Sequence, residues 1–178
     1  IGAGGITING YGIGPSVRDG VSAAGSNDSA ISKAAAFNAV SGQTGVTATV
    51  SATTLAGVAA TAPVAISGNA TDFIYVNNVK LGAIAAGADA TMQGANIAAA
   101  FNAVSNQSGV TATFSTSTGA VTLTAADGRN ISLIGGGAAD TAATGLTLGA
   151  GGNIVGAGAA AVGAGAALFD DIDEILAR

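Results

Sequence analysis

The side chains that could carry out chemistry in this chain are few, and most of them are carboxylates. The 178 residues include no Cys and no His. This removes the usual ligands of zinc, haem, iron–sulfur and copper sites, and it excludes catalysis through a His- or Cys-based dyad or triad. Four of the ten acidic residues lie close together, at Asp170, Asp171, Asp173 and Glu174. Their spacing is not that of a calcium loop, so we interpret them as the first turn of a helix, where the helix dipole favours acids.

Five further aspartates, separated by long stretches of chain, can be considered for catalysis: Asp19, Asp72, Asp89, Asp127 and Asp140. A catalytic carboxylate pair needs a cleft that brings two of them together, and nothing in the pattern predicts one. The Gly/Ala run at 156–167 lacks the preceding buried strand and the following acidic residue of a dinucleotide-binding loop, so we interpret it as low-complexity sequence. We therefore predict no catalytic, cofactor-binding or metal-binding residue, and no enzyme activity.

The charge balance excludes further classes. Five Lys+Arg against ten Asp+Glu give a net charge of −5, too few cations to neutralise many phosphates, so we predict no nucleic-acid binding. We expect the scattered cations to be solvated: Arg18, Lys33, Lys80 and Arg129. The uncharged stretch 141–169 is mainly Gly and Ala, which is too weakly apolar for a membrane span, so we predict no membrane insertion.

The strongest signal in the sequence is an internal repeat. Residues 34–51 and 98–115 are identical at 15 of 18 positions, with an offset of 64 residues. This period is too long for most solenoid units and indicates a duplicated small domain. Each copy also contains a dipeptide that begins with Asn between short β-prone runs. These dipeptides, Asn9–Gly10 and Asn77–Asn78, each predict a hairpin with a type I′ turn.

A helix and further strands follow each hairpin. Apolar residues at Ile97, Phe101 and Val104 lie on one face of a helix predicted over about 91–104, with Asp89 or Thr91 as its N-cap. The equivalent helix of the first copy carries Phe37 behind possible caps at 26–28, and Gly42 and Asn106 suit the helix ends. Strands are expected at 46–53 and 110–116, then a hairpin at 120–133 that turns at 126–129 and has a vague counterpart near 58–66.

The fold class predicted from these elements is α+β. It consists of two tandem β-β-α-β-β units, each with one helix on a small antiparallel sheet, followed by a Gly/Ala-rich return segment. The expected domains are a first copy at 1–68, a second copy at 69–135, and a Gly/Ala-rich segment at 136–178 that ends in a short amphipathic helix.

The repeated motifs resemble the IN-type repeat of bacterial flagellins. The matching residues are 8–10, 36–39 and 43–48 in the first copy, and 100–103, 107–112 and 123–131 in the second. Phe37 and Phe101 replace the Ile that is usual in the family, and Asn78 replaces Gly in the second hairpin. The resemblance covers about 6–133 and implies the variable, surface-exposed outer region of a flagellin, a structural protein of the extracellular filament that serves motility.

The same resemblance implies other copies of the subunit as partners in a helical filament, and it makes O-linked glycans on Ser or Thr possible. Four N-glycosylation sequons, at Asn27, Asn69, Asn106 and Asn130, are no clear excess over chance. Two alternatives stay open: a hook-associated or filament-cap protein of the same family, and a carbohydrate- or host-binding adhesin module. Because the chain begins at Ile1 without a signal sequence, we expect it to be part of a longer protein, with Ile1 and Arg178 at the same end of the molecule.

Overall fold

The computed structural model describes residues 1–2, 5–148 and 153–155, and within these ranges the chain is a mixed α+β protein. No helix in the described ranges is long and apolar enough to cross a membrane. In chain order, the elements are β1 (Thr7–Ile8), β2 (Tyr11–Gly12), α1 (Ala30–Asn38), α2 (Ser41–Thr44), β3 (Thr53–Ala56), β4 (Phe73–Val76), β5 (Val79–Lys80), α3 (Ala90–Ala103), α4 (Ser105–Ser108), β6 (Thr111–Phe114), β7 (Val121–Ala125), β8 (Ile131–Gly136), α5 (Thr141–Thr144) and β9 (Asn153–Val155).

Both predicted hairpins are present, as β1–β2 and β4–β5. Their turn residues adopt the left-handed conformation that a type I′ turn requires: φ is 50° at Asn9 and 83° at Gly10, and 47° at Asn77 and 66° at Asn78. These angles confirm the predicted turns. The turns form at these positions because Asn and Gly tolerate positive φ better than other residues.

The two main helices begin at side-chain caps. Asp89, one of the two predicted caps of α3, is the one that caps it: its Oδ1 accepts a hydrogen bond of 2.8 Å from Met92 N. The expected cap of α1 at 26–28 is wrong, because Ser29 is the residue in extended conformation directly before the helix and its Oγ accepts from Ser32 N at 3.0 Å.

The predicted helix ends at Gly42 and Asn106 are also wrong. Both residues lie inside the short helices α2 and α4, which continue after α1 and α3. The chain leaves these helices at Gly45 and Gly109, each with φ of 72°. Only a left-handed residue can reverse the chain there, and glycine adopts that conformation without strain.

The strands of the described residues form three antiparallel sheets, β1–β2, β3–β7–β6 and β5–β4–β8–β9. The predicted hairpin over 120–133 is wrong, because its two strands belong to different sheets. β7 has β3 and β6 on its two edges, and β8 has β4 and β9, so neither has an edge left for the other. The turn at 126–129 therefore carries the chain from one sheet to the next.

The strand expected at 46–53 is displaced along the chain. β3 begins at Thr53 and pairs with β7, with Leu55 opposite Leu123, so a strand from the first copy completes a sheet of the second. Near the vague counterpart at 58–66, the described chain forms only an isolated bridge between Ile66 and Ile84. Strands need a partner to satisfy their backbone groups, and β7 supplies one to 53–56.

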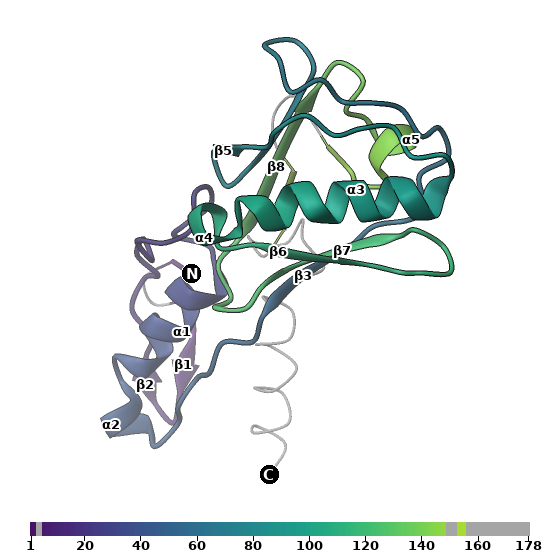
Figure 1. Ribbon diagram of the computed structural model, residues 1–178. Coiled ribbons are helices and arrows are strands. Elements are labelled where there is room, and N and C mark those ends of the chain that lie inside the picture. The colour runs from purple at the N-terminus through teal and green to yellow at the C-terminus, as the bar shows by residue number, and fades with distance from the viewer. Residues whose placement is uncertain (3–4, 149–152, 156–178) are drawn as a thin grey trace.

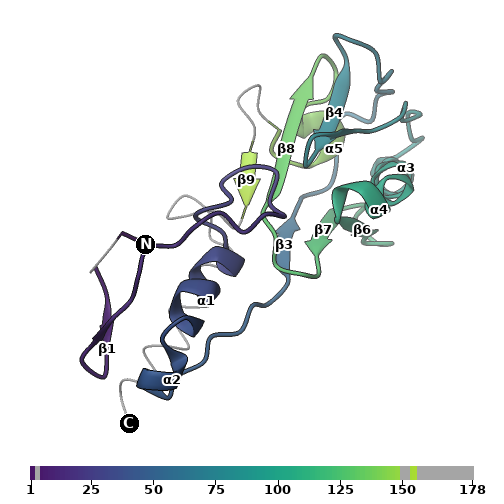
Figure 2. The same ribbon diagram turned by 90° about the vertical axis from the view of Figure 1, so that its left-hand side faces the viewer.

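The larger core lies where α3 packs on β6 and β7, with β4 and β8 close by (Figure 1). Its centre includes Ile97 and Phe101, both 0% exposed, which confirms the predicted apolar face of α3. The first copy has a smaller cluster around Ile8, Ile13 and Phe37. Figures 1 and 2 show α1, α2, β1 and β2 as a group to one side of the larger core.

The described part of the 136–178 segment contains the end of β8, α5 and β9. Val155 pairs with Ile131, so the chain reaches the side of the second copy that faces α1 (Figure 2). Residues 156–178 lie outside the described residues. The Gly/Ala run, the acidic cluster at 170–174, the amphipathic helix and the position of Arg178 are therefore predictions on which the structure does not bear.

Candidate functional site

Each of the scattered aspartates has a local partner, and Asp19 and Asp127 both lie close enough to Arg129 for their charges to raise its pKa. Asp89 and Asp140 are N-caps, of α3 and α5. Asp72 Oδ2 accepts from Ser67 N and Ser67 Oγ, both at 2.7 Å, and these bonds hold the pKa of its carboxyl below the ordinary value. Among the described residues no three acidic side chains gather where they could hold a metal ion.

Asp127, expected as a turn residue, also forms an ion pair with Arg129. Its Oδ2 lies 2.7 Å from Arg129 Nη2 and accepts from Arg129 Nε at 2.8 Å. Partial burial would raise the pKa of Asp127, but the bonds and the charge of Arg129 outweigh it and the pKa is lowered. The expectation that Arg129 is simply solvated is therefore wrong, and so is that for Lys33, which is 8% exposed. These two cations differ from Lys80, whose exposed ammonium donates to Asn69 O.

The repeated asparagines carry matching hydrogen bonds in the two copies. In the hairpins, Asn9 Nδ2 donates to Thr44 O at 2.8 Å and Asn77 Nδ2 donates to Ser108 O at 2.9 Å. Each bond ties the turn of a hairpin to the last residue of a short helix, α2 or α4. The bonds satisfy carbonyl groups that a helix end leaves free.

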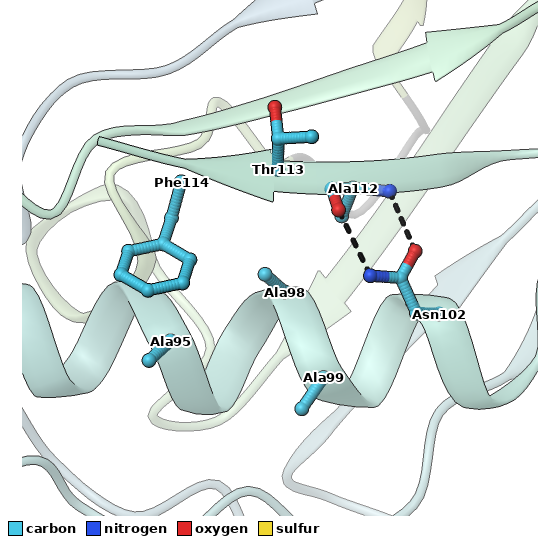
Figure 3. A pocket seen from close by; sticks show the side chains of 7 residues that line it. All are labelled: Ala95, Ala98, Ala99, Asn102, Ala112, Thr113 and Phe114. Carbon is cyan, nitrogen blue, oxygen red and sulfur yellow. Dashed lines mark hydrogen bonds between the residues drawn. The ribbon is translucent and has the colours of Figure 1, made fainter. Parts of the chain in front are cut away.

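A second pair of repeated asparagines joins each helix to the segment that follows. Asn102 Nδ2 donates to Ala112 O at 2.8 Å, and Ala112 N donates to Asn102 Oδ1 at 2.8 Å (Figure 3). Asn38 makes the same two bonds with Ala48, at 2.9 and 2.7 Å. An amide side chain thus acts as a short piece of strand, and this explains why Asn follows Phe in both motifs.

The two copies meet at Asn130, a residue of the motif at 123–131 and of a possible glycosylation sequon. Its side chain is fully buried, and Nδ2 donates to Ala24 O at 3.0 Å and to Gly25 O at 2.9 Å. Its backbone N donates at 3.0 Å to Ser22 Oγ, which in turn donates to Asp19 Oδ2 at 2.6 Å. A buried amide is a poor acceptor for a glycan, so the Asn130 sequon is unsuited to modification in the folded chain. Contacts between residues more than 100 positions apart leave no periodic pattern in the sequence, so only the tertiary structure reveals this junction.

An open groove of about 430 Å³ lies between α3 and β6 (Figure 3). It is lined by Ala95, Ala98, Ala99, Asn102, Ala112, Thr113 and Phe114. The lining consists of methyl groups, one ring, one hydroxyl and one amide, and the amide is already bonded to Ala112. The groove could take an apolar group, but its lining holds no general acid, base or nucleophile of the usual kinds.

No known protein-family model matches the chain, and no curated protein matches it.

Proposed function

We propose that this chain is the surface-exposed outer region of a bacterial flagellin, a structural part of the extracellular filament that serves motility. The observation that carries the proposal is that the motif residues have the same structural roles in both copies. Asn9 and Asn77, Asn38 and Asn102, and Gly45 and Gly109 make equivalent turns or hydrogen bonds. These are the residues on which the resemblance to the IN-type repeat depends.

The finer organisation belongs to the same proposal. We infer two tandem β-β-α-β-β units, at 1–68 and 69–135, as the ancestral pattern, with the 136–178 segment returning the chain to the filament core. The path of β3 into the sheet of the second copy is a departure from strict tandem units. The pairing of β3 with β7 couples the two copies mechanically, because moving them apart breaks a ladder of backbone hydrogen bonds.

In this proposal the partners are other copies of the subunit, held side by side by core segments outside this chain. The role is structural, without catalysis or a resident cofactor. Charged residues make up only 8% of the sequence, so the outer face of the filament would present mainly hydroxyls, amides and small apolar groups. Exposed Ser and Thr could carry O-linked glycans. The hydrogen bonds of Asn130 to residues 22, 24 and 25 link the second copy to the first.

An antibody raised against this chain tests the proposal on cells that produce it. Immunogold electron microscopy should show label along the whole length of the flagellar filament. Label confined to the filament tip or to the hook junction would instead identify a cap or hook-associated protein. Label on the cell body alone would overturn the proposal in favour of an adhesin, and a glycan array would then be the next measurement.

A further inference from the structure

The two hairpin turns differ in one residue that matters for covalent chemistry. Asn9–Gly10 is the only Asn–Gly pair in the sequence, and the equivalent turn of the second copy is Asn77–Asn78. Both turns have positive φ at both positions, so the backbone geometry is shared. The pair therefore provides a natural comparison between a turn with glycine and the same turn without it.

The asparagine side chains of the two turns are held differently. Asn77 is bonded at both ends of its amide: Nδ2 donates to Ser108 O at 2.9 Å, and Oδ1 accepts from Ser132 N at 2.9 Å. Asn9 Nδ2 donates to Thr44 O at 2.8 Å, but Asn9 Oδ1 accepts no hydrogen bond from any residue in the described ranges. The difference arises because β8 lies beside β4 in the second copy, whereas no described strand lies on the corresponding edge of β1.

The turn of the first copy is also open to its surroundings. Asn9 and Gly10 are both exposed, and a Cβ placed on Gly10 would meet nothing within 4 Å. β1 and β2 contain two residues each, so few ladder bonds oppose local opening. Opening lets the Asn9 backbone rotate, and the backbone N of Gly10 then meets no side chain that hinders its approach to the amide.

We propose that Asn9 is a site of spontaneous deamidation. It is the asparagine that is followed by glycine, and of its amide only Nδ2 is hydrogen-bonded to a described residue. The Gly10 backbone nitrogen, losing its proton to solvent base, attacks Asn9 Cγ and forms a new C–N bond. The Cγ–Nδ2 bond breaks and Nδ2 leaves as ammonia, which gives a five-membered succinimide. Water then adds to either carbonyl of the ring and opens it, and the product is aspartate or isoaspartate. No step changes an oxidation state, and water is the only co-reactant.

The reaction removes the bond that ties the hairpin to α2. The product carboxylate has no N–H to donate, and its negative charge faces the carbonyl of Thr44 at the carboxyl end of a helix. Isoaspartate also adds a methylene to the backbone, which a two-residue turn has no room to absorb. Deamidation is therefore expected to loosen the hairpin of the first copy while leaving that of the second intact.

Incubating the intact chain at mildly alkaline pH, followed by peptide mapping with mass spectrometry, tests the proposal, since Asn9 and Asn77 are measured in one sample. We expect Asn9 to convert about tenfold faster than Asn77, a barrier lower by about 1.4 kcal/mol. Gly10→Asn, which installs the dipeptide of the second copy, should slow Asn9 but leave it faster than Asn77, because Asn9 still lacks the second hydrogen bond that Ser132 N gives to Asn77. Equal rates at Asn9 and Asn77, or an unchanged rate in Gly10→Asn, would overturn the proposal.

A second variant separates the effect of glycine from that of the held amide. Asn78→Gly gives both turns the Asn–Gly pair, so any remaining difference comes from structure. We expect Asn77 in this variant to convert more slowly than Asn9 in the same molecule, and the two rates to become equal in denaturant. Equal rates in the folded protein would show that the bond from Ser132 N gives no protection, contrary to the proposal.

Discussion

The side-chain amide of Asn102 and the backbone of Ala112 form a closed pair of hydrogen bonds, both 2.8 Å long (Figure 3). β6 is an edge strand of the sheet β3–β7–β6, and these bonds occupy an N–H and a C=O on its open side. Unpaired edge strands are templates for pairing with other chains. The amide thus stabilises the contact with α3 and blocks the edge at the same point.

Asn102→Ala is expected to lower the free energy of unfolding by about 1–3 kcal/mol, because it removes two bonds and leaves the backbone groups of Ala112 without this partner. Chemical denaturation measures the loss, and light scattering reports any increase in aggregation from the opened edge. Asn96→Ala serves as the control on the same helix, since its Nδ2 makes one bond, to Ala85 O. Equal losses in the two variants would argue against the special role of Asn102.

Phe101→Ala is expected to cost about 3–5 kcal/mol, the usual range for a buried aromatic residue. The side chain is 0% exposed in the larger core. Phe37→Ala should cost less, because Phe37 belongs to a smaller cluster whose other members include half-buried residues that can move into the space. Thermal and denaturant unfolding of both variants would measure the difference, and a negligible loss in Phe101→Ala would contradict the packing of α3.

Thr53→Val is expected to leave stability unchanged or to raise it by about 1 kcal/mol. Thr53 is fully buried in β3, and its Oγ1 has no hydrogen-bond partner among the residues that the structure describes. Valine has nearly the same shape, removes the unsatisfied hydroxyl and favours strands. Thr54→Val, at the neighbouring exposed position, is the control for strand propensity alone. A large destabilisation by Thr53→Val would show that the hydroxyl has a partner in solution.

Acid should weaken the junction between the two copies through Asp19. Partial burial raises the pKa of this carboxyl, but hydrogen bonds led by that from Ser22 outweigh it, so the folded-state pKa lies below the ordinary value of 3.8. A group with a depressed folded-state pKa contributes its full stabilisation above the ordinary value and loses it as the pH falls through the folded-state value. We therefore expect stability to decline below about pH 4.

Asp19→Asn should flatten this decline without abolishing it, because the pKa values of Asp72 and Asp127 are also lowered. Denaturation midpoints measured across the acid range would test this. Chemical shifts of the Asn130 side-chain amide would show whether the junction itself opens, since Ser22 links it to Asp19. An acid slope identical in the variant and the parent chain would contradict the role of Asp19.

Local features followed directly from the sequence. The turns at Asn9–Gly10 and Asn77–Asn78, the apolar face of α3 and its cap at Asp89 depend on residues within a few positions of one another. Their physical causes are the tolerance of Asn and Gly for positive φ, the helical period and a hydrogen bond to a free backbone N–H. The mixed α+β class was also predictable, because the periodicities of helix and strand are both present.

The partners of the strands were decided only by tertiary structure. A run that alternates apolar residues with Thr, such as 121–125, can pair equally well with several others, and the choice of β3 and β6 over β8 depends on how α3 and both sheets share one core. The same is true of the junction, where Asn130 meets backbone carbonyls of 24 and 25. Local sequence contains no information on such distant contacts, since the free energy that selects them comes from burial and hydrogen-bond satisfaction in the assembled fold.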